Sequence, residues 1–99
     1  MIINPPAATV AVTNGTYTGD NTVNRAIAHG LGVVPKFVFC ANATDGQSIS
    51  QLAGAGRCYH TSASLTVTAA DTTNFYVGNA TQYGRSANAD TLVYTWAAI

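Results

Sequence analysis

A chain of 99 residues has room for one domain, and its 8% of charged side chains and formal net charge of zero set it apart from an average soluble protein. Its four cationic side chains are scattered, so it lacks the basic surface on which nucleic-acid binding depends. No apolar run approaches the roughly 18 residues of a membrane span, so we expect no membrane insertion. The first residues show no signal peptide, which favours folding in a cytoplasm unless the chain is an excised fragment.

The start of the chain predicts an arm rather than a part of the core. Residues 1–8 contain a Pro-Pro pair and few apolar anchors. The alternation of residues 9–13 indicates a short strand, and Asn14-Gly15 is typical of a hairpin turn that would send the chain back. We therefore assign residues 1–21 to an N-terminal arm with room for a short hairpin.

The next segment alternates in a way that favours a strand. Over residues 23–29, the side chains of Val23, Arg25, Ile27 and His29 fall on one side of an extended chain. An amphipathic helix is the competing interpretation. The β-favouring residues at its start and the glycines that follow it favour the strand.

A glycine-rich turn then leads into what we expect to be the middle of the fold. Gly30 and Gly32 bracket one leucine, which suits a sharp turn with positive φ, and Pro35 holds the chain extended. Residues 36–41 form a strand that is apolar on both faces. Such a strand is usually central and covered on both sides.

The second half of the chain alternates between short strands and polar connections. Residues 42–55 are small and polar and predict a long loop, with at most a weak strand at 48–52. Residues 78–89 predict a flexible polar loop. Trp96 alternates with other apolar residues in the last strand, so core packing is expected for it. Further strands are expected at residues 57–60, 64–68, 75–77 and 91–99.

Together these patterns predict an all-β fold. Residues 22–99 should form an antiparallel β-sandwich of about six or seven strands, with no helix longer than about two turns. One face of the last strand, made by Val93, Thr95 and Ala97, has no evident partner within the chain. Because the core is thin and charges are few, we expect further cover from copies of the same chain, as a homo-oligomer and specifically a trimer.

The cysteines and histidines do not form a recognisable motif. Cys40 and Cys58 could form a staple between strands or could be two small buried apolar side chains, and the missing secretory signal favours the second interpretation. His29, beside a tight turn, is expected to bind a loop carbonyl, whereas His60 could be structural or make a surface contact. Their spacing fits no zinc pattern, so no metal or cofactor is expected.

Catalytic groupings are also missing from the sequence. A nucleophile needs a base and a group that orients the base, and no local motif supplies them. The acidic residues lie in turns, where Asp is common for backbone reasons. We therefore expect no enzyme activity.

Recognition of a sugar remains as the best use of the exposed polar residues. A sugar site combines planar hydrogen-bonding groups with an aromatic face. Two segments, each with an arginine close to a tyrosine, offer this combination within an otherwise weakly charged chain. The candidate ligand-binding residues are Asp45, Arg57, Tyr59, His60, Tyr83 and Arg85.

Three motifs carry a resemblance to known families. The run from His29 to Val38, the strand Asn74–Val77 and the terminal Tyr94 to Ala98 resemble C-terminal domains of bacteriophage tail fibres and related virion proteins. The strand order is also similar to that of the H-type lectin sandwich, whose members form trimers and bind N-acetylgalactosamine-type sugars. The chain departs from the lectin pattern over residues 42–56, which affects any transfer of the sugar site.

The resemblance implies a virion protein that is assembled in the cytoplasm of a bacterial host. Its function would be that of a tail-fibre or fibre-tip receptor-binding domain, with host surface glycan and other virion proteins as partners. The alternative is a structural decoration or head-fibre protein without a sugar ligand.

Overall fold

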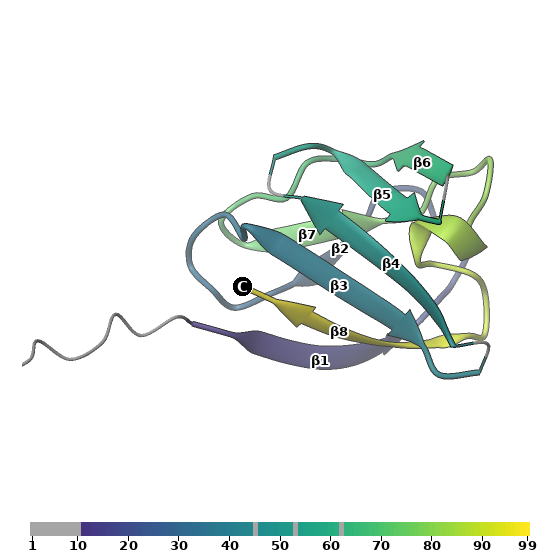
Figure 1. The fold of residues 1–99 in the computed structure, drawn as a ribbon, viewed down its shortest axis with the longest axis horizontal. Coiled ribbons are helices and arrows are strands. Elements are labelled where there is room, and N and C mark those ends of the chain that lie inside the picture. The colour runs from purple at the N-terminus through teal and green to yellow at the C-terminus, as the bar shows by residue number, and fades with distance from the viewer. Residues whose placement is uncertain (1–10, 45, 53, 62) are drawn as a thin grey trace, which may run out of the picture.

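The structure is a computed structural model, described here for residues 11–44, 46–52, 54–61 and 63–99. These residues form an all-β fold of antiparallel strands in two sheets, with one turn of 3₁₀ helix, η1 (Gly84–Ser86), as the only helical element among them. None of the described residues forms a helix that could span a membrane. The strands are β1 (Thr13–Thr18), β2 (Arg25–Ala28), β3 (Phe37–Asn42), β4 (Gln47–Leu52), β5 (Arg57–His60), β6 (Ala63–Thr66), β7 (Asn74–Val77) and β8 (Val93–Ala98) (Figure 1).

The larger sheet has six strands in the order β1-β8-β3-β4-β5-β6, and the smaller sheet pairs β2 with β7. The small sheet packs on one face of the large one, which makes a sandwich-like arrangement (Figure 1). The prediction of an all-β antiparallel fold is confirmed, and the described residues contain eight strands where about six or seven were expected.

The hairpin expected at Asn14-Gly15 is not formed. Both residues lie inside β1, which pairs with β8 along its whole length. Gly15 stands opposite Trp96, and a Cβ atom at Gly15 would come within 2.9 Å of the indole Nε1. The glycine is therefore explained by the ring that packs against it and not by a turn. Residues 1–10 lie outside the described part of the chain.

The long loop expected over residues 42–55 is largely replaced by a strand, at the place where the sequence indicated at most a weak one. β4 lies within it and pairs with β3 over the full length of both strands. Ile49 and Gln51 are buried, whereas their neighbours Ser48, Ser50 and Leu52 face outward. The Gln51 amide donates to the backbone oxygen of Tyr76 at 2.7 Å, which compensates for its burial. The strand is stabilised by these distant partners, which local propensity does not reveal.

β3 is central in the order of the large sheet, as predicted, because β8 and β4 flank it. Only one of its faces is covered by the described residues. Val38 and Cys40 are buried, whereas Phe37 is 36% and Phe39 is 40% exposed. The expected cover on the second face is therefore not supplied by the described residues of this chain.

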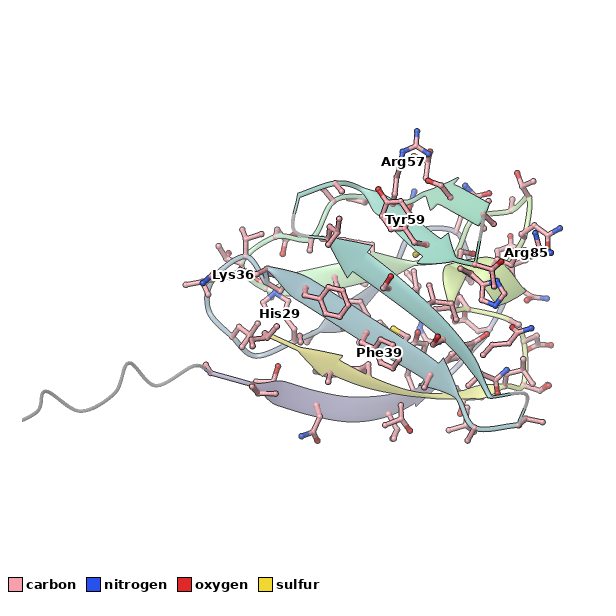
Figure 2. The ribbon with its side chains drawn as sticks, in the orientation of Figure 1. His29, Lys36, Phe39, Arg57, Tyr59 and Arg85 are labelled. Carbon is pink, nitrogen blue, oxygen red and sulfur yellow. The ribbon has the colours of Figure 1, made fainter. Side chains whose placement is uncertain are left out.

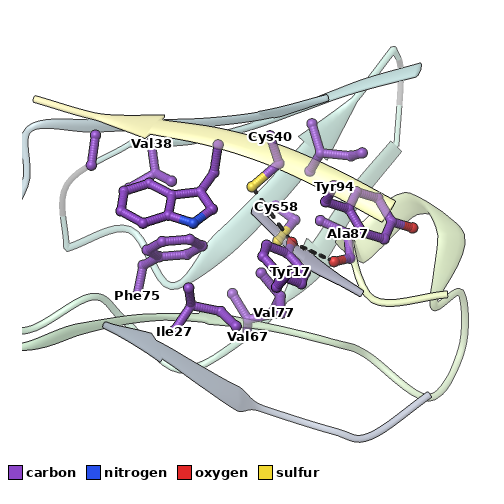
Figure 3. Packing of buried hydrophobic residues seen from close by; sticks show 13 residues of the cluster. Tyr17, Ile27, Val38, Cys40, Cys58, Val67, Phe75, Val77, Ala87 and Tyr94 are labelled. Carbon is purple, nitrogen blue, oxygen red and sulfur yellow. Dashed lines mark hydrogen bonds between the residues drawn. The ribbon is translucent and has the colours of Figure 1, made fainter. Parts of the chain in front are cut away.

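The core lies between the two sheets and combines aliphatic side chains with two aromatic pairs (Figure 3). Phe75 and Trp96 meet edge to face with ring centroids 5.2 Å apart, and Tyr17 and Tyr94 stack at 5.3 Å. The Tyr17 hydroxyl donates to the backbone oxygen of Ala87 at 2.6 Å. Burial of this hydroxyl raises the pKa of Tyr17 above its usual value. Core packing of Trp96 is confirmed, since its side chain is only 7% exposed.

Cys40 and Cys58 are buried and free, so they do not form a staple between strands. Burial raises the pKa of each thiol to about 12, so both remain protonated at neutral pH. The Gln51 amide donates to the Cys58 sulfur at 3.2 Å. Both cysteines act as small apolar core residues.

Replacing both cysteines with alanine is expected to lower the free energy of unfolding by only roughly 1–3 kcal/mol in total, because two small side chains are removed from the core. A reducing agent should leave the melting temperature of the parent chain unchanged, since no disulfide is present. Thermal melts followed by circular dichroism, with and without reductant, measure both effects. Unfolding of the parent chain by reductant alone would contradict this prediction.

Candidate functional site

Arg57 and Tyr59 lie side by side on the outer face of β5, with the buried Cys58 between them pointing into the core. The Arg57 guanidinium is exposed and donates to the Ser64 hydroxyl on β6 at 3.2 Å. Tyr59 is half-buried and stands opposite Ser50 and Ser64 in the sheet. The predicted strand at residues 57–60 is confirmed, and it places these two candidate residues on one face (Figure 2).

The second expected segment, Tyr83 and Arg85, lies in and beside η1. Arg85 is exposed and Tyr83 is half-buried. η1 packs against β5 from the core side, where the backbone oxygen of Ser86 lies 3.9 Å from the Cys58 sulfur. The two segments are therefore neighbours, but Arg57 and Arg85 project from different margins of the molecule (Figure 2).

His60 and Asp45 complete the set of candidates. His60 is half-buried at the end of β5, and its Nδ1 is a buried atom without a hydrogen-bond partner among the described residues. By alternation, His60 shares the inner side of β5 with Cys58 rather than the outer side with Tyr59. Asp45 lies outside the described residues. The structure thus brings only Arg57 and Tyr59 together on one surface.

His29 has the structural role that its place beside the turn predicted. It is buried, its Nδ1 accepts from the backbone N–H of Leu31 at 3.0 Å, and its Nε2 lies 2.7 Å from the backbone oxygen of Asp71. Because Nδ1 accepts, the proton resides on Nε2, which donates to this oxygen. Gly30 and Gly32 adopt φ of 73° and 74°, as the turn requires.

A buried polar cluster, which we name the Asn88 network, joins the loop after β1 to the loop before β8. The Asn88 amide nitrogen donates to the Asp20 carboxylate at 2.9 Å and to the Thr22 backbone oxygen at 2.8 Å. The Asn88 side-chain oxygen accepts from the Asp20 backbone N–H and from Arg25, both at 3.3 Å. The flexible loop expected over residues 78–89 is therefore held in place, and Ser86, Ala87 and Asn88 within it are fully buried.

The carboxylates of Asp20 and Asp71, whose pKa values are lowered, accept hydrogen bonds from nearby backbone N–H groups. Hydrogen bonds from Thr22, then from Asn88, hold the pKa of Asp20 below its usual value. Hydrogen bonds from the Asn74 backbone and the Tyr76 hydroxyl do the same for the pKa of Asp71. Each carboxylate thus stabilises a turn.

Sequence reasoning missed the Asn88 network because its members are distant in the chain. Asp20 and Thr22 have the spacing of a local turn motif, and the Thr22 hydroxyl donates to Asp20 at 2.6 Å. Their partner Asn88 comes much later, in a segment without any distinctive pattern. Arg25 is part of the same structural cluster, and its guanidinium carbon lies 5.4 Å from the centroid of the Tyr17 ring.

No group of three or more His, Cys, Asp or Glu side chains that could hold a metal ion occurs in the described part of the chain. A scan of protein-family models, a search of curated proteins and a search of solved structures each found no match. The assignment of function therefore depends on the chemistry of Arg57, Tyr59 and the surfaces around them.

Proposed function

We propose that this chain is the receptor-binding domain of a bacteriophage tail fibre or fibre tip and that it recognises glycan on the host surface. The observation that carries the proposal is the exposed guanidinium of Arg57 beside the ring of Tyr59 on the outer face of β5. Sugar hydroxyl pairs accept hydrogen bonds from a fork-shaped donor, and the C–H face of a sugar stacks on a ring. A guanidinium has five N–H donors, and Ser64 takes one of them.

The other candidates have at most a secondary part in this proposal. Arg85, Tyr83 and His60 do not share the outer face of β5, since η1 packs on the core side of that strand and His60 shares its inner side. We propose that the domain acts as a trimer on the virion, after assembly in the bacterial cytoplasm. Single sugar sites bind weakly, and several copies on one fibre gain affinity through avidity.

Arg57→Ala and Arg85→Ala test the site separately. We expect Arg57→Ala to weaken binding to host cells or to an arrayed glycan by about 10-fold or more, because a charge-assisted hydrogen bond contributes roughly 1.5–3 kcal/mol. Arg85→Ala should have a smaller effect, since Arg85 projects from a different margin of the molecule than Arg57. Both side chains are exposed, so the melting temperatures should stay close to that of the parent.

Lys36→Ala is the matched control, because Lys36 is an exposed cation at the opposite end of the molecule (Figure 2). It should bind as the parent does. If both arginine variants fold and bind as the parent does, the glycan site is elsewhere.

A structural decoration or head-fibre role is the second candidate. It is favoured by the use of Asp20 and Asp71, which engage turns of this chain and so have less capacity to bind a sugar. The same arginine variants distinguish the two roles, because a decoration protein would show no binding to host cells that depends on Arg57.

A further inference from the structure

The outer face of the six-stranded sheet is defined here as the outward-facing side of β1, β8, β3 and β4. These four strands contain no Asp, Glu, Lys or Arg. Their outward side chains include large apolar groups, with Phe39 at 40%, Val93 at 47% and Leu52 at 54% exposure. The small sheet covers the opposite face of these strands, so the outer face is open in the described structure.

The strand register gathers the apolar groups into one patch. Phe37 stands opposite Leu52 of β4, and its backbone is hydrogen-bonded to the backbone of Ile99, just after β8. Phe39 stands opposite Ala97 of β8. These five residues are therefore neighbours across β4, β3 and the end of β8. The neighbouring rows contain small residues and are equally without charge.

The size of this face suits a stable contact. Four strands about 4.8 Å apart, each six residues of about 3.3 Å, span roughly 400 Å² before side-chain relief is counted. A pair of such faces buries about 1,000 Å² in total once that relief is included, which is the lower bound for a specific interface. The apolar groups occupy one part of this face, and the largest exposed apolar patch of a protein is often functional.

The charge pattern indicates what covers it. A face without a single charge offers nothing to orient a charged partner such as nucleic acid or an anionic membrane. The surface that matches it best is an equally uncharged one, and this chain supplies it, with 8% charged residues overall. Arg57 lies on β5, just beyond the patch, where a polar rim is expected.

We propose that a second copy of this chain covers the outer face of the six-stranded sheet and buries Phe37, Phe39 and Leu52. The expected number of copies, three, rests on the proposed function, whereas the choice of surface rests on the apolar patch. The proposed glycan site on β5 borders this contact, because Tyr59 stands opposite Ser50 of β4.

The test measures the mass of the assembly in solution for the parent, Phe39→Lys and Thr95→Lys. Light scattering and sedimentation should give a multiple of the 10.2 kDa chain for the parent. A lysine at either position would be buried without a partner, so we expect the assembly to weaken by about 30-fold or more. Circular dichroism should show that both variants keep the parent fold, because both side chains point outward.

Val33→Lys is the matched control, since Val33 is 62% exposed but lies in the turn region outside the sheet. It should assemble as the parent does. If Phe39→Lys fails to fold, Thr95→Lys decides the question.

A parent chain that stays at 10.2 kDa up to about 100 μM would overturn the proposal, because a contact that does not form at that concentration is too weak to cover this face in a lasting assembly. Assembly of the folded lysine variants at parent strength would overturn it as well. Failure of the proposed function is recognised separately: Arg57→Ala would then assemble and still bind host cells as the parent does. A dimer in place of a trimer would support the proposal that this face is the interface, but it would contradict the expected number of three copies.

Discussion

Trp96→Ala is expected to lower the free energy of unfolding by about 3–5 kcal/mol, the range for removing a large buried aromatic side chain. The indole packs against the backbone at Gly15 on one side and the Phe75 ring on the other. No flexible side chain is available at Gly15 to fill the space. A small domain has a total stability of roughly 5–15 kcal/mol, so the loss takes a large share of it.

Urea titration followed by circular dichroism measures this change, because Trp96 is the only tryptophan and its fluorescence is lost in the variant. Val33→Ala provides the comparison, since Val33 is exposed and should change stability by less than about 0.5 kcal/mol. A loss of less than about 1 kcal/mol in Trp96→Ala would show that the indole is not packed as described.

Asn88→Ala should lower the free energy of unfolding by roughly 2–4 kcal/mol, because the fully buried Asn88 side chain makes several hydrogen bonds at once, two of them to the charged groups of Asp20 and Arg25. The backbone oxygen of Thr22 would lose the donor that lies 2.8 Å away, and Arg25 would lose an acceptor. Alanine cannot replace either, and the site is too enclosed for full solvation.

Asn14→Ala is the matched control, because this asparagine is exposed on β1 and should change the unfolding free energy by less than about 0.5 kcal/mol. Hydrogen exchange adds a local measurement. The amide of Asn21, which donates to the Asn88 backbone oxygen at 2.9 Å, should exchange faster in Asn88→Ala. Unchanged stability and exchange would mean that the Asn88 network does not hold the two loops.

Strand positions were predictable from sequence wherever inward and outward residues differ in polarity. β7 follows such an alternation, and its Phe75 and Val77 are buried as expected. β3 and β8 were predicted from their β-favouring residues, although both carry apolar side chains on both faces. β4 was predicted only as a weak strand, because its inward-facing Gln51 is polar. The Gln51 amide is buried with a hydrogen bond to the backbone oxygen of Tyr76 in the small sheet. Local patterns do not encode a partner of that kind.

The predictions about turns and about the site differed for a related reason. Asn14-Gly15 has the strongest short-range hairpin signal, yet packing of Trp96 against the glycine determines its conformation. Arg57 and Tyr59 could be placed on one face by counting residues along β5. The inward packing of η1, which separates Arg85 from them, follows from buried contacts of Ser86 and Ala87 that the sequence does not announce.

The position of β8 inside the large sheet has a consequence for how the chain folds. β8 lies between β1 and β3, so neither strand has its full set of backbone partners until residues 93–98 have joined them. Pairings this far apart in sequence are slow to form, with folding times of roughly milliseconds to seconds. During synthesis the nascent chain therefore exposes two open strand edges to chaperones and to neighbouring chains until its final strand has left the ribosome.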